Sequence, residues 1–498
     1  MRNGISSFKK NALSALMCLV VFMLVIPTAV FAYTDRAISF EAEEHILSQL
    51  RGVRIPNASI GVIQGGETSY IFKDSTHDTL FQIGSVSKSF TGFGVLYLEY
   101  EGLLSVSDPV NKHLPWVEVY YNGVPVPHED MTIGNLLHHT SGFTSDERHF
   151  TPYLTGGLTA NAFIAQITGV ELAFYPSTQF VYGNVNYVIL GLLIETVSGL
   201  SYDEFMTQNI LHPLGLYNTF TNPMRAYETG AVIGGNSLGF LRTRSQNFNI
   251  TPLVIPAGFI YSNITDMVRW AQIHLGMIDV SEHFMRVIQR SHELSPISGN
   301  PYAGLDFHYA AGWVVHSGYG FIEHNGGAPG YSATLRMYHD RNTAVVFLSN
   351  LNYSPIARVS DFIFDTTEGG VFHELPTDFF GYLDVIFTII TVIGIAYALL
   401  FARLVIKLMK RMRSGERIWG KTNPKVIARL IGLVISLAVL IGSYLVPPAI
   451  FGNSRVYLVL FEPASSVTAT TALWVIAAYY FCSFLIQLFA SPRPARAE

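Results

Sequence analysis

A serine and a lysine three residues apart, Ser85 and Lys88, are the side chains of this sequence best suited to covalent chemistry. They lie in Gly84-Ser85-Val86-Ser87-Lys88, at the start of a run with helical periodicity, and side chains three apart share one helical face. A serine hydroxyl is a weak nucleophile until a base takes its proton, and a desolvated lysine is able to take it. The positive end of the helix also favours the developing alkoxide. On its own the pair is a weak signal, because a capping serine and a solvated lysine would give the same pattern.

Two further motifs follow in chain order. Tyr182-Gly183-Asn184 stands before a predicted helix, and His324-Asn325-Gly326 ends a predicted strand. With these motifs the chain resembles the serine β-lactamase and penicillin-binding-protein superfamily, specifically the class C-like branch that includes D-stereospecific peptidases and esterases. The resemblance covers about residues 38–360. Further segments that are similar to the family lie at 81–85, 107–110, 114–115, 132–142, 212–216, 256–262 and 326–331.

The resemblance implies a role for each matching residue. Ser85 is the acylated nucleophile, Lys88 is its proton partner, and Tyr182 is the base for acylation and for the activation of water. Asn184 hydrogen-bonds the substrate amide and Lys88. The oxyanion hole consists of the backbone N–H groups of Ser85 and Gly327, and losing one such donor typically costs on the order of 100- to 1000-fold in rate. The mechanism requires no metal and no cofactor.

The third motif departs from the Lys-Thr-Gly of true β-lactamases, because His324 and Asn325 stand in place of the lysine and the hydroxyl. The lysine helps to bind a substrate carboxylate, whereas a histidine is mostly neutral near pH 7. The resemblance therefore implies substrate-binding positions at His324, Asn325 and Gly326, with weaker recognition of a carboxylate. A structural strand histidine is the alternative for His324, and Arg336 is a candidate for a replacement charge that the sequence does not place.

His138-His139 is the one pair of histidines that invites a metal interpretation. Adjacent side chains on a helix face different ways, and no matching histidine spacing or acidic partner set accompanies them. We therefore expect no metal site.

The elements that must position these residues follow from periodicity and turn residues. Strands are expected at 58–62, 68–72, 311–316, 321–324, 332–338 and 344–348, and helices at 85–101, 186–198, 263–276 and 355–365. Strands at both ends with helices between them predict an α+β (α/β) fold: a β-lactamase-like antiparallel sheet flanked by helices, with a helical subdomain.

Composition indicates that the chain is not wholly soluble. It has 498 residues, of which 49% are hydrophobic and 13% charged, against roughly 25% charged in a typical soluble domain. Residues 1–32 read as a signal peptide, with an uncleaved N-terminal anchor as the alternative. Apolar stretches near 382–406, 428–451 and 467–489 have the length of transmembrane helices. The domains expected are the leader, a hydrolase domain at 33–375 and a three-helix membrane region at 376–498.

The distribution of charge predicts which side of the membrane the hydrolase domain occupies. The loop 403–429 carries nine bases and one acid, which makes it cytoplasmic by the positive-inside rule. The domain at 33–375 is then extracytoplasmic. The net charge of −5 offers no basic surface for nucleic acid.

These observations predict a membrane-tethered extracytoplasmic serine hydrolase that forms an acyl-enzyme on a small amide or ester, with a cell-wall peptide containing D-residues as one candidate. A penicillin-binding D-Ala carboxypeptidase or a β-lactamase is the alternative within the class. A non-catalytic binding or sensor domain coupled to the membrane helices is the alternative outside it. The partners expected are a small-molecule or peptide substrate and the lipid bilayer, and the sequence leaves the oligomeric state open.

Overall fold

The computed structural model describes residues 38–143, 159–246, 250–295, 307–415 and 465–492, except positions 354, 369 and 377, together with 417–419 and scattered positions in 431–442. The predicted leader at 1–32 and most of the predicted span at 428–451 lie outside the described residues.

Seven antiparallel strands form the main sheet in the order β10-β11-β12-β13-β14-β1-β2. The first and last strands of the domain, β1 and β14, are neighbours in this sheet, with Ile60 opposite Phe347. The strands are β1 (Ala58–Gln64), β2 (Glu67–Lys73), β10 (His308–Tyr309), β11 (Val314–His316), β12 (Phe321–Ala328), β13 (Tyr331–Tyr338) and β14 (Thr343–Ser349). Because β13 and β14 are buried at every position, both of their faces must be covered.

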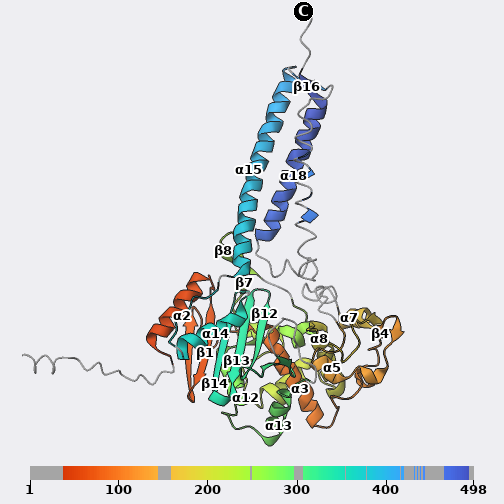
Figure 1. Ribbon diagram of the computed structural model, residues 1–498, viewed down its shortest axis with the longest axis vertical. Helices are drawn as coiled ribbons and strands as arrows, with labels where there is room; N and C mark the ends of the chain where they lie inside the picture. The colour runs from red at the N-terminus through yellow and green to blue at the C-terminus, as the bar shows by residue number, and fades with distance from the viewer. Residues whose placement is uncertain are drawn as a thin grey trace, which may run out of the picture.

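Helices cover the two faces of this sheet (Figure 1). On one face α2 (Phe40–Gly52) and α14 (Ile356–Glu368) pack with Val345 and Phe347. On the other face α3 (Ser87–Tyr100), α8 (Asn184–Ser198), α12 (Ile264–His274) and α13 (Glu282–Ser291) belong to a larger core that includes Val346 and Leu348. The alternation along β14 therefore separates the two cores.

The helical subdomain and the connections contain shorter elements. They are β3 (Phe81–Gln82), η1 (Gly84–Val86), α4 (Val110–His113), β4 (Val119–Tyr121), β5 (Val124–Pro125), η2 (His128–Asp130), α5 (Ile133–Leu137), α7 (Ala160–Ile167), β6 (Val170–Glu171), α9 (Tyr202–Met206), η3 (Thr207–Leu211), α10 (Pro223–Glu228), β7 (Gly235–Gly239), β8 (Arg242–Gln246), η4 (Pro252–Val254), α11 (Ile255–Gly258), β9 (Tyr261–Ser262) and η5 (His339–Arg341). The predicted α+β fold, with an antiparallel sheet and flanking helices, is confirmed.

Two helix ends lie where glycine and asparagine in the sequence predict them. α8 ends at Gly199, whose φ of +72° is the left-handed conformation that glycine adopts easily. Asn263 caps α12 by accepting the backbone N–H of Asp266 at 2.9 Å.

One strand is shorter than the sequence predicts. The run expected at 311–316 is extended only from Val314, because Gly312 turns with φ +84° against α3. A Cβ at Gly312 would lie 2.3 Å from the carbonyl oxygen of Lys88. The close approach of two backbones, which the sequence pattern does not reveal, ends the strand.

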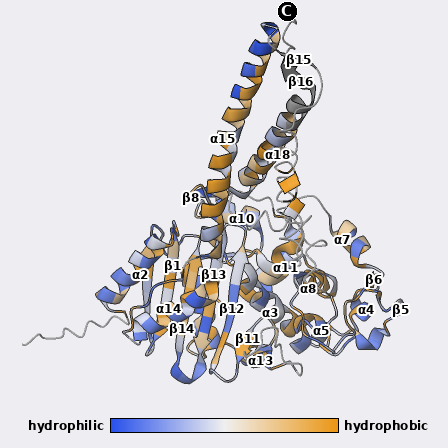
Figure 2. Cartoon of the chain, turned by 45° about the horizontal axis from the view of Figure 1, so that its top comes forward, coloured by the Kyte–Doolittle hydropathy of each residue, from blue (hydrophilic) through white to orange (hydrophobic). Residues whose placement is uncertain are grey.

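Two helices within the described residues are long and apolar enough to cross a membrane: α15 (Phe379–Arg413) and α18 (Ser465–Phe489). They run side by side away from the domain, and Figure 2 shows that α15 is largely hydrophobic until its far end. Gly394 allows the approach, since a Cβ there would lie 2.2 Å from that of Ala472. Two β-strands at the far end, β15 (Arg417–Trp419) and β16 (Ala490–Pro492), pair with each other.

The segment between α14 and α15 contacts the domain through Leu375 and Pro376. Leu375 is buried in the smaller core and its backbone N–H donates to Gln49 Oε1 at 3.1 Å. The hydroxyl of Tyr353 donates to the carbonyl oxygen of Pro376 at 2.5 Å. The last turn before α15 is therefore part of the domain.

Candidate active site

Ser85 and Lys88 lie where the sequence predicts, at the start of a buried helix. Ser85 is in the 3-10 turn η1, and α3 follows directly with Lys88 in its first turn. The side chain of Lys88 is fully buried, and its Nζ lies 3.3 Å from Ser85 Oγ. Buried residues surround the helix, and Phe90 stacks on Trp270 with ring centres 4.4 Å apart. The packing keeps Lys88 beside the serine hydroxyl.

Two further groups fix the ammonium of Lys88. It donates to Asn184 Oδ1 at 2.7 Å and to the carbonyl oxygen of Ala257 at 2.5 Å. Asn184 was predicted to bind Lys88, but Ala257 was not assigned a role. Ala257 lies in the segment 256–262, which resembles the family. Its role cannot be read from the sequence, because the acceptor is a backbone carbonyl and any residue type carries one.

Tyr182 lies beside the same ammonium. The segment before α8 carries it, and Lys88 Nζ lies 4.8 Å from the centre of its ring. The ring of His139 packs against it with centres 4.5 Å apart. His139 Nδ1 accepts hydrogen bonds from the backbone N–H of Gly183 at 3.3 Å and from Asn186 Nδ2 at 2.9 Å. His139 therefore joins the turn that carries Tyr182 to the start of α8.

The other wall of the site is β12, which runs past η1 on backbone contacts. A Cβ at Gly326 would lie 2.1 Å from the carbonyl oxygen of Ile83. A Cβ at Gly84, where φ is +53°, would lie 2.7 Å from the backbone nitrogen of Gly327. Glycine at both positions lets the strand approach the turn that carries Ser85. The predicted oxyanion donors, the N–H groups of Ser85 and Gly327, are thereby brought to one place.

His324 points toward Lys88 and Tyr309, away from solvent. Its Nε2 lies 3.0 Å from the hydroxyl oxygen of Tyr309, and its Nδ1 lies 2.9 Å from the carbonyl oxygen of Asn325. Burial, with the charge of Lys88 as a smaller cause, lowers the pKa of His324 to about 3. The imidazole is therefore neutral in the physiological range.

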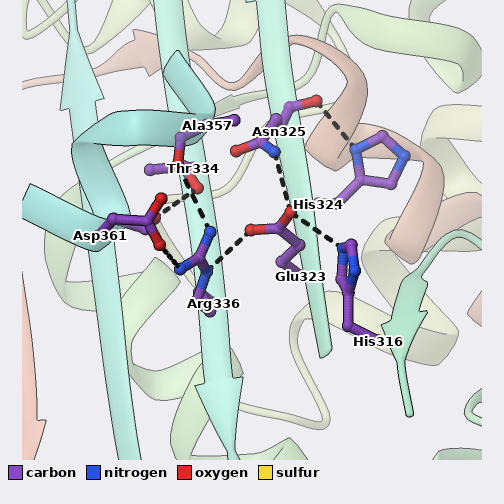
Figure 3. A network of polar contacts seen from close by, with 9 residues as sticks. His316, Glu323, His324, Asn325, Thr334, Arg336, Ala357 and Asp361 are labelled. Carbon is purple, nitrogen blue, oxygen red and sulfur yellow. Dashed lines mark hydrogen bonds and ion pairs between the residues drawn. The ribbon is translucent and has the colours of Figure 1, made fainter. Parts of the chain in front are cut away.

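Asn325 and Arg336 belong to the opposite face of the sheet, under α14 (Figure 3). Asn325 Nδ2 donates to Glu323 Oε1 at 3.3 Å, and Arg336 Nε donates to Glu323 Oε2 at 2.8 Å. Arg336 also pairs with Asp361. The register places Glu323 directly opposite Arg336, so this cation is neutralised away from Ser85. The structure thus brings Ser85, Lys88, Tyr182, Asn184, His324, Gly326 and Gly327 together, and separates the side chain of Asn325 from them.

The adjacent histidines serve different neighbours. His138 Nδ1 lies 3.0 Å from the carbonyl oxygen of Tyr309, whereas His139 faces Tyr182 and Asn186. Among the described residues, no three His, Cys, Asp or Glu side chains are arranged to hold a metal ion.

An antiparallel sheet, a helical subdomain and a Ser-x-x-Lys motif at the start of a buried helix define the class of serine β-lactamase-like proteins. The family model described as Beta-lactamase matches residues 43–366, and the chain belongs to this family, whose members are generally serine hydrolases. The predicted resemblance is confirmed.

Individual relatives agree with this assignment. Protein flp of Staphylococcus aureus is 27% identical over 418 residues, which are 82% of each chain. The structure of an octameric penicillin-binding protein homologue from Pyrococcus abyssi has a TM-score of 0.57 at 25% identity, over 70% of this chain and 80% of that one. D-alanine carboxypeptidase AmpC from Burkholderia cenocepacia has a TM-score of 0.54 at 22% identity, over 66% and 99%. The last likeness is one of fold alone.

Proposed function

We propose that this protein is a membrane-tethered extracytoplasmic serine hydrolase that forms an acyl-enzyme at Ser85 on a small amide or ester. The observation that carries the proposal is the contact of 3.3 Å between Ser85 Oγ and the Nζ of the fully buried Lys88, with the ammonium fixed by Asn184 and Ala257. A solvated surface lysine, the alternative for this motif, would show none of these contacts.

The reaction takes two steps. In the first, Ser85 Oγ bonds to the substrate carbonyl carbon as its proton passes to the phenolate oxygen of Tyr182, the base of the Lys88–Tyr182 pair, with the Lys88 ammonium beside it. The bond to the leaving group then breaks, and the leaving nitrogen or oxygen takes that proton. In the second, a water molecule gives a proton to the same pair and attacks the ester, which releases the acid and restores the Ser85 hydroxyl. The N–H groups of Ser85 and Gly327 stabilise the oxyanion in both steps.

Charge near Ser85 favours substrates without a carboxylate at the position that lysine serves in true β-lactamases. His324 is neutral there, and the ion pairs of Arg336 hold it on the other face of the sheet. A neutral ester or amide loses nothing by this arrangement, whereas a β-lactam or a D-Ala-D-Ala peptide loses an ion pair. A cell-wall peptide containing D-residues remains a candidate when its carboxylate lies elsewhere.

The tether and its orientation rest on α15. Its domain end follows Asp378, and its far end carries Lys410, Arg411 and Arg413. By the positive-inside rule the basic end is cytoplasmic, which puts the hydrolase domain outside.

Labelling of the full-length chain in detergent micelles tests the hydrolase assignment. A fluorophosphonate should modify Ser85, and sequencing of the modified peptide distinguishes Ser85 from Ser87 and Ser89. Ser85→Ala should abolish the label. Ser107→Ala, at an exposed loop serine, is the matched control and should retain it. A screen of esters, D-aminoacyl amides and nitrocefin then compares wild type with Ser85→Ala. Stable labelling by a fluorescent penicillin would favour the carboxypeptidase alternative. An absence of both labels in folded protein would leave the binding or sensor role.

A further inference from the structure

Asp384, near the start of α15, makes an unusual set of contacts. Its side chain is fully buried, and its carboxylate accepts the backbone N–H groups of Phe240 at 2.8 Å and Leu241 at 2.7 Å. The hydroxyl of Ser465, the first residue of α18, donates to it at 2.6 Å. One carboxylate therefore joins both described membrane helices to the tip of the β7–β8 hairpin.

The hairpin tip needs such a partner. Phe240 and Leu241 have φ values of +55° and +62°, the left-handed conformation of a two-residue turn that glycine and asparagine usually occupy. Neither residue is of that kind, so the turn is strained, and two charge-assisted hydrogen bonds hold it. The base of the hairpin is fixed as well, because the backbone N–H of Asn236 donates to the carbonyl oxygen of Gly330 at 3.1 Å.

Asp384 also fixes where the tip lies along α15. Directly after it the helix exposes an apolar surface that begins with Val385 and Ile386. The tip therefore lies level with the first turn of the apolar span, as Figure 1 shows for the hairpin beside the base of α15.

The side chains at this level suit a lipid headgroup layer. Leu241 is 49% exposed, and Arg242 and Arg244 of β8 are exposed beside it. On α15 itself Phe379 and Tyr382 are exposed at the same end. Aromatic residues gather at the level of lipid headgroups, and arginines pair with their phosphates.

We propose that the β7–β8 hairpin is a membrane-contacting element whose tip sits among the lipid headgroups around α15, and that Asp384 holds it there. The proposal rests on the membrane tether of the proposed function and goes beyond it. Leu241 enters the apolar boundary, while Arg242 and Arg244 bind lipid phosphates. The other end of the hairpin is hydrogen-bonded to Gly330, in the turn after β12. The hairpin therefore fixes the distance between the domain and the bilayer surface.

Depth-dependent quenching tests this contact. The full-length chain, with Cys18→Ser and Cys482→Ser, receives a polarity-sensitive fluorophore at Leu241→Cys or Met285→Cys. Met285 is 47% exposed in α13, at the end of the domain away from α15, and is the matched control (Figure 1). In liposomes containing phosphatidylglycerol, the label at position 241 should emit at a shorter wavelength than the free fluorophore in detergent-free buffer because its surroundings are less polar, and a headgroup-proximal lipid quencher should dim it. The label at position 285 should show neither change. Equal quenching and equal spectral shift of the two labels, in protein that floats with the liposomes, would overturn the hairpin proposal alone. Failure to float would overturn the tether as well.

Substitutions of the two arginines and of Asp384 separate the parts of the proposal. Arg242→Gln with Arg244→Gln should remove the increase in quenching with phosphatidylglycerol content, and an unchanged increase would refute lipid binding by these arginines. Asp384→Ala should reduce quenching at 241, whereas Asp378→Ala, which removes the side-chain cap of α15 and leaves the carboxylate of Asp384 in place, should not. Equal quenching in the two aspartate variants would refute the role of Asp384.

Discussion

His139 shows how a residue outside the reacting group controls the geometry of this site. Its Nδ1 accepts hydrogen bonds from Gly183 and Asn186, so the proton of the neutral ring resides on Nε2. Burial, with the charge of Lys88 as a smaller cause, holds its pKa well below the usual value. A neutral imidazole is therefore the form that keeps Tyr182 in place.

Replacing His139 should impair turnover through Tyr182 without removing a reacting group. His139→Leu leaves the N–H of Gly183 without an acceptor, and we expect kcat to fall by about 10- to 100-fold as the position of Tyr182 loosens. His139→Asn offers an acceptor oxygen near the Nδ1 position and should recover much of that loss. The measurement is kcat and its pH profile for an ester that the screen identifies. If the role of His139 were purely structural, His139→Leu and His139→Asn would be equally inactive, and the pH dependence of kcat would be unaltered.

At the scale of elements, the approach of β12 to η1 decides whether the proposed oxyanion donors, the backbone N–H groups of Ser85 and Gly327, meet. The contact is between backbones, and Gly84 and Gly326 permit it. The sequence contains these glycines, but a glycine-rich run weakens a strand prediction, which is why β12 was expected to end at 324 and in fact continues to Ala328.

Gly326→Ala should therefore separate the two walls of the site. The new Cβ would meet the Ile83 carbonyl oxygen at 2.1 Å, and we expect a loss of about 1–3 kcal/mol in the free energy of unfolding together with a loss of labelling at Ser85. Gly318→Ala, where no atom lies within 4 Å and φ is not positive, is the control and should change neither quantity. Wild-type labelling of Gly326→Ala would show that the approach is not needed.

The elements predictable from sequence are those specified locally. Helix ends at Gly102 and Gly199 and the cap at Asn263 are each determined by a few neighbouring residues, and the structure has them as expected. Contacts between distant segments were not predictable. The carbonyl of Ala257 on Lys88 and the pairing of Arg336 with Glu323 depend on how the sheet and helices pack, which no local pattern encodes.

At the scale of the whole molecule, buried neutral histidines link stability to pH. Burial is the main cause that lowers the pKa of His139, His274, His292 and His324, to about 3 for the last two. In the unfolded chain a histidine titrates near 6.5. Between these values the unfolded chain binds protons that the folded chain does not, so stability is greatest above pH 6.5 and falls as the pH drops toward 3.

The thermal midpoint should therefore fall steadily between pH 6.5 and pH 5, a range above the titration of most carboxyl groups. Each histidine contributes about 1.4 kcal/mol per pH unit in that window. Melting of the full-length protein in nanodiscs at a series of pH values measures it. His77→Gln, at an exposed position, should leave the slope as it is. A midpoint that stays constant from pH 7 to pH 5 would contradict the burial of neutral imidazoles.

We expect the β-lactamase-like domain to end sharply just before α15, and truncation can test this boundary. A fragment of 33–377 keeps Leu375 in the smaller core and the acceptor for Tyr353, whereas 33–368 loses both. We expect the longer fragment to be soluble and labelled at Ser85, and the shorter one to be less stable by about 2–4 kcal/mol. Urea unfolding compares them, and the probe tests the site in each. If the longer fragment were insoluble or unlabelled, the hydrolase domain would depend on α15 for its fold. Equal stability would mean that the segment packed on α2 and Tyr353 acts only as a linker to the membrane.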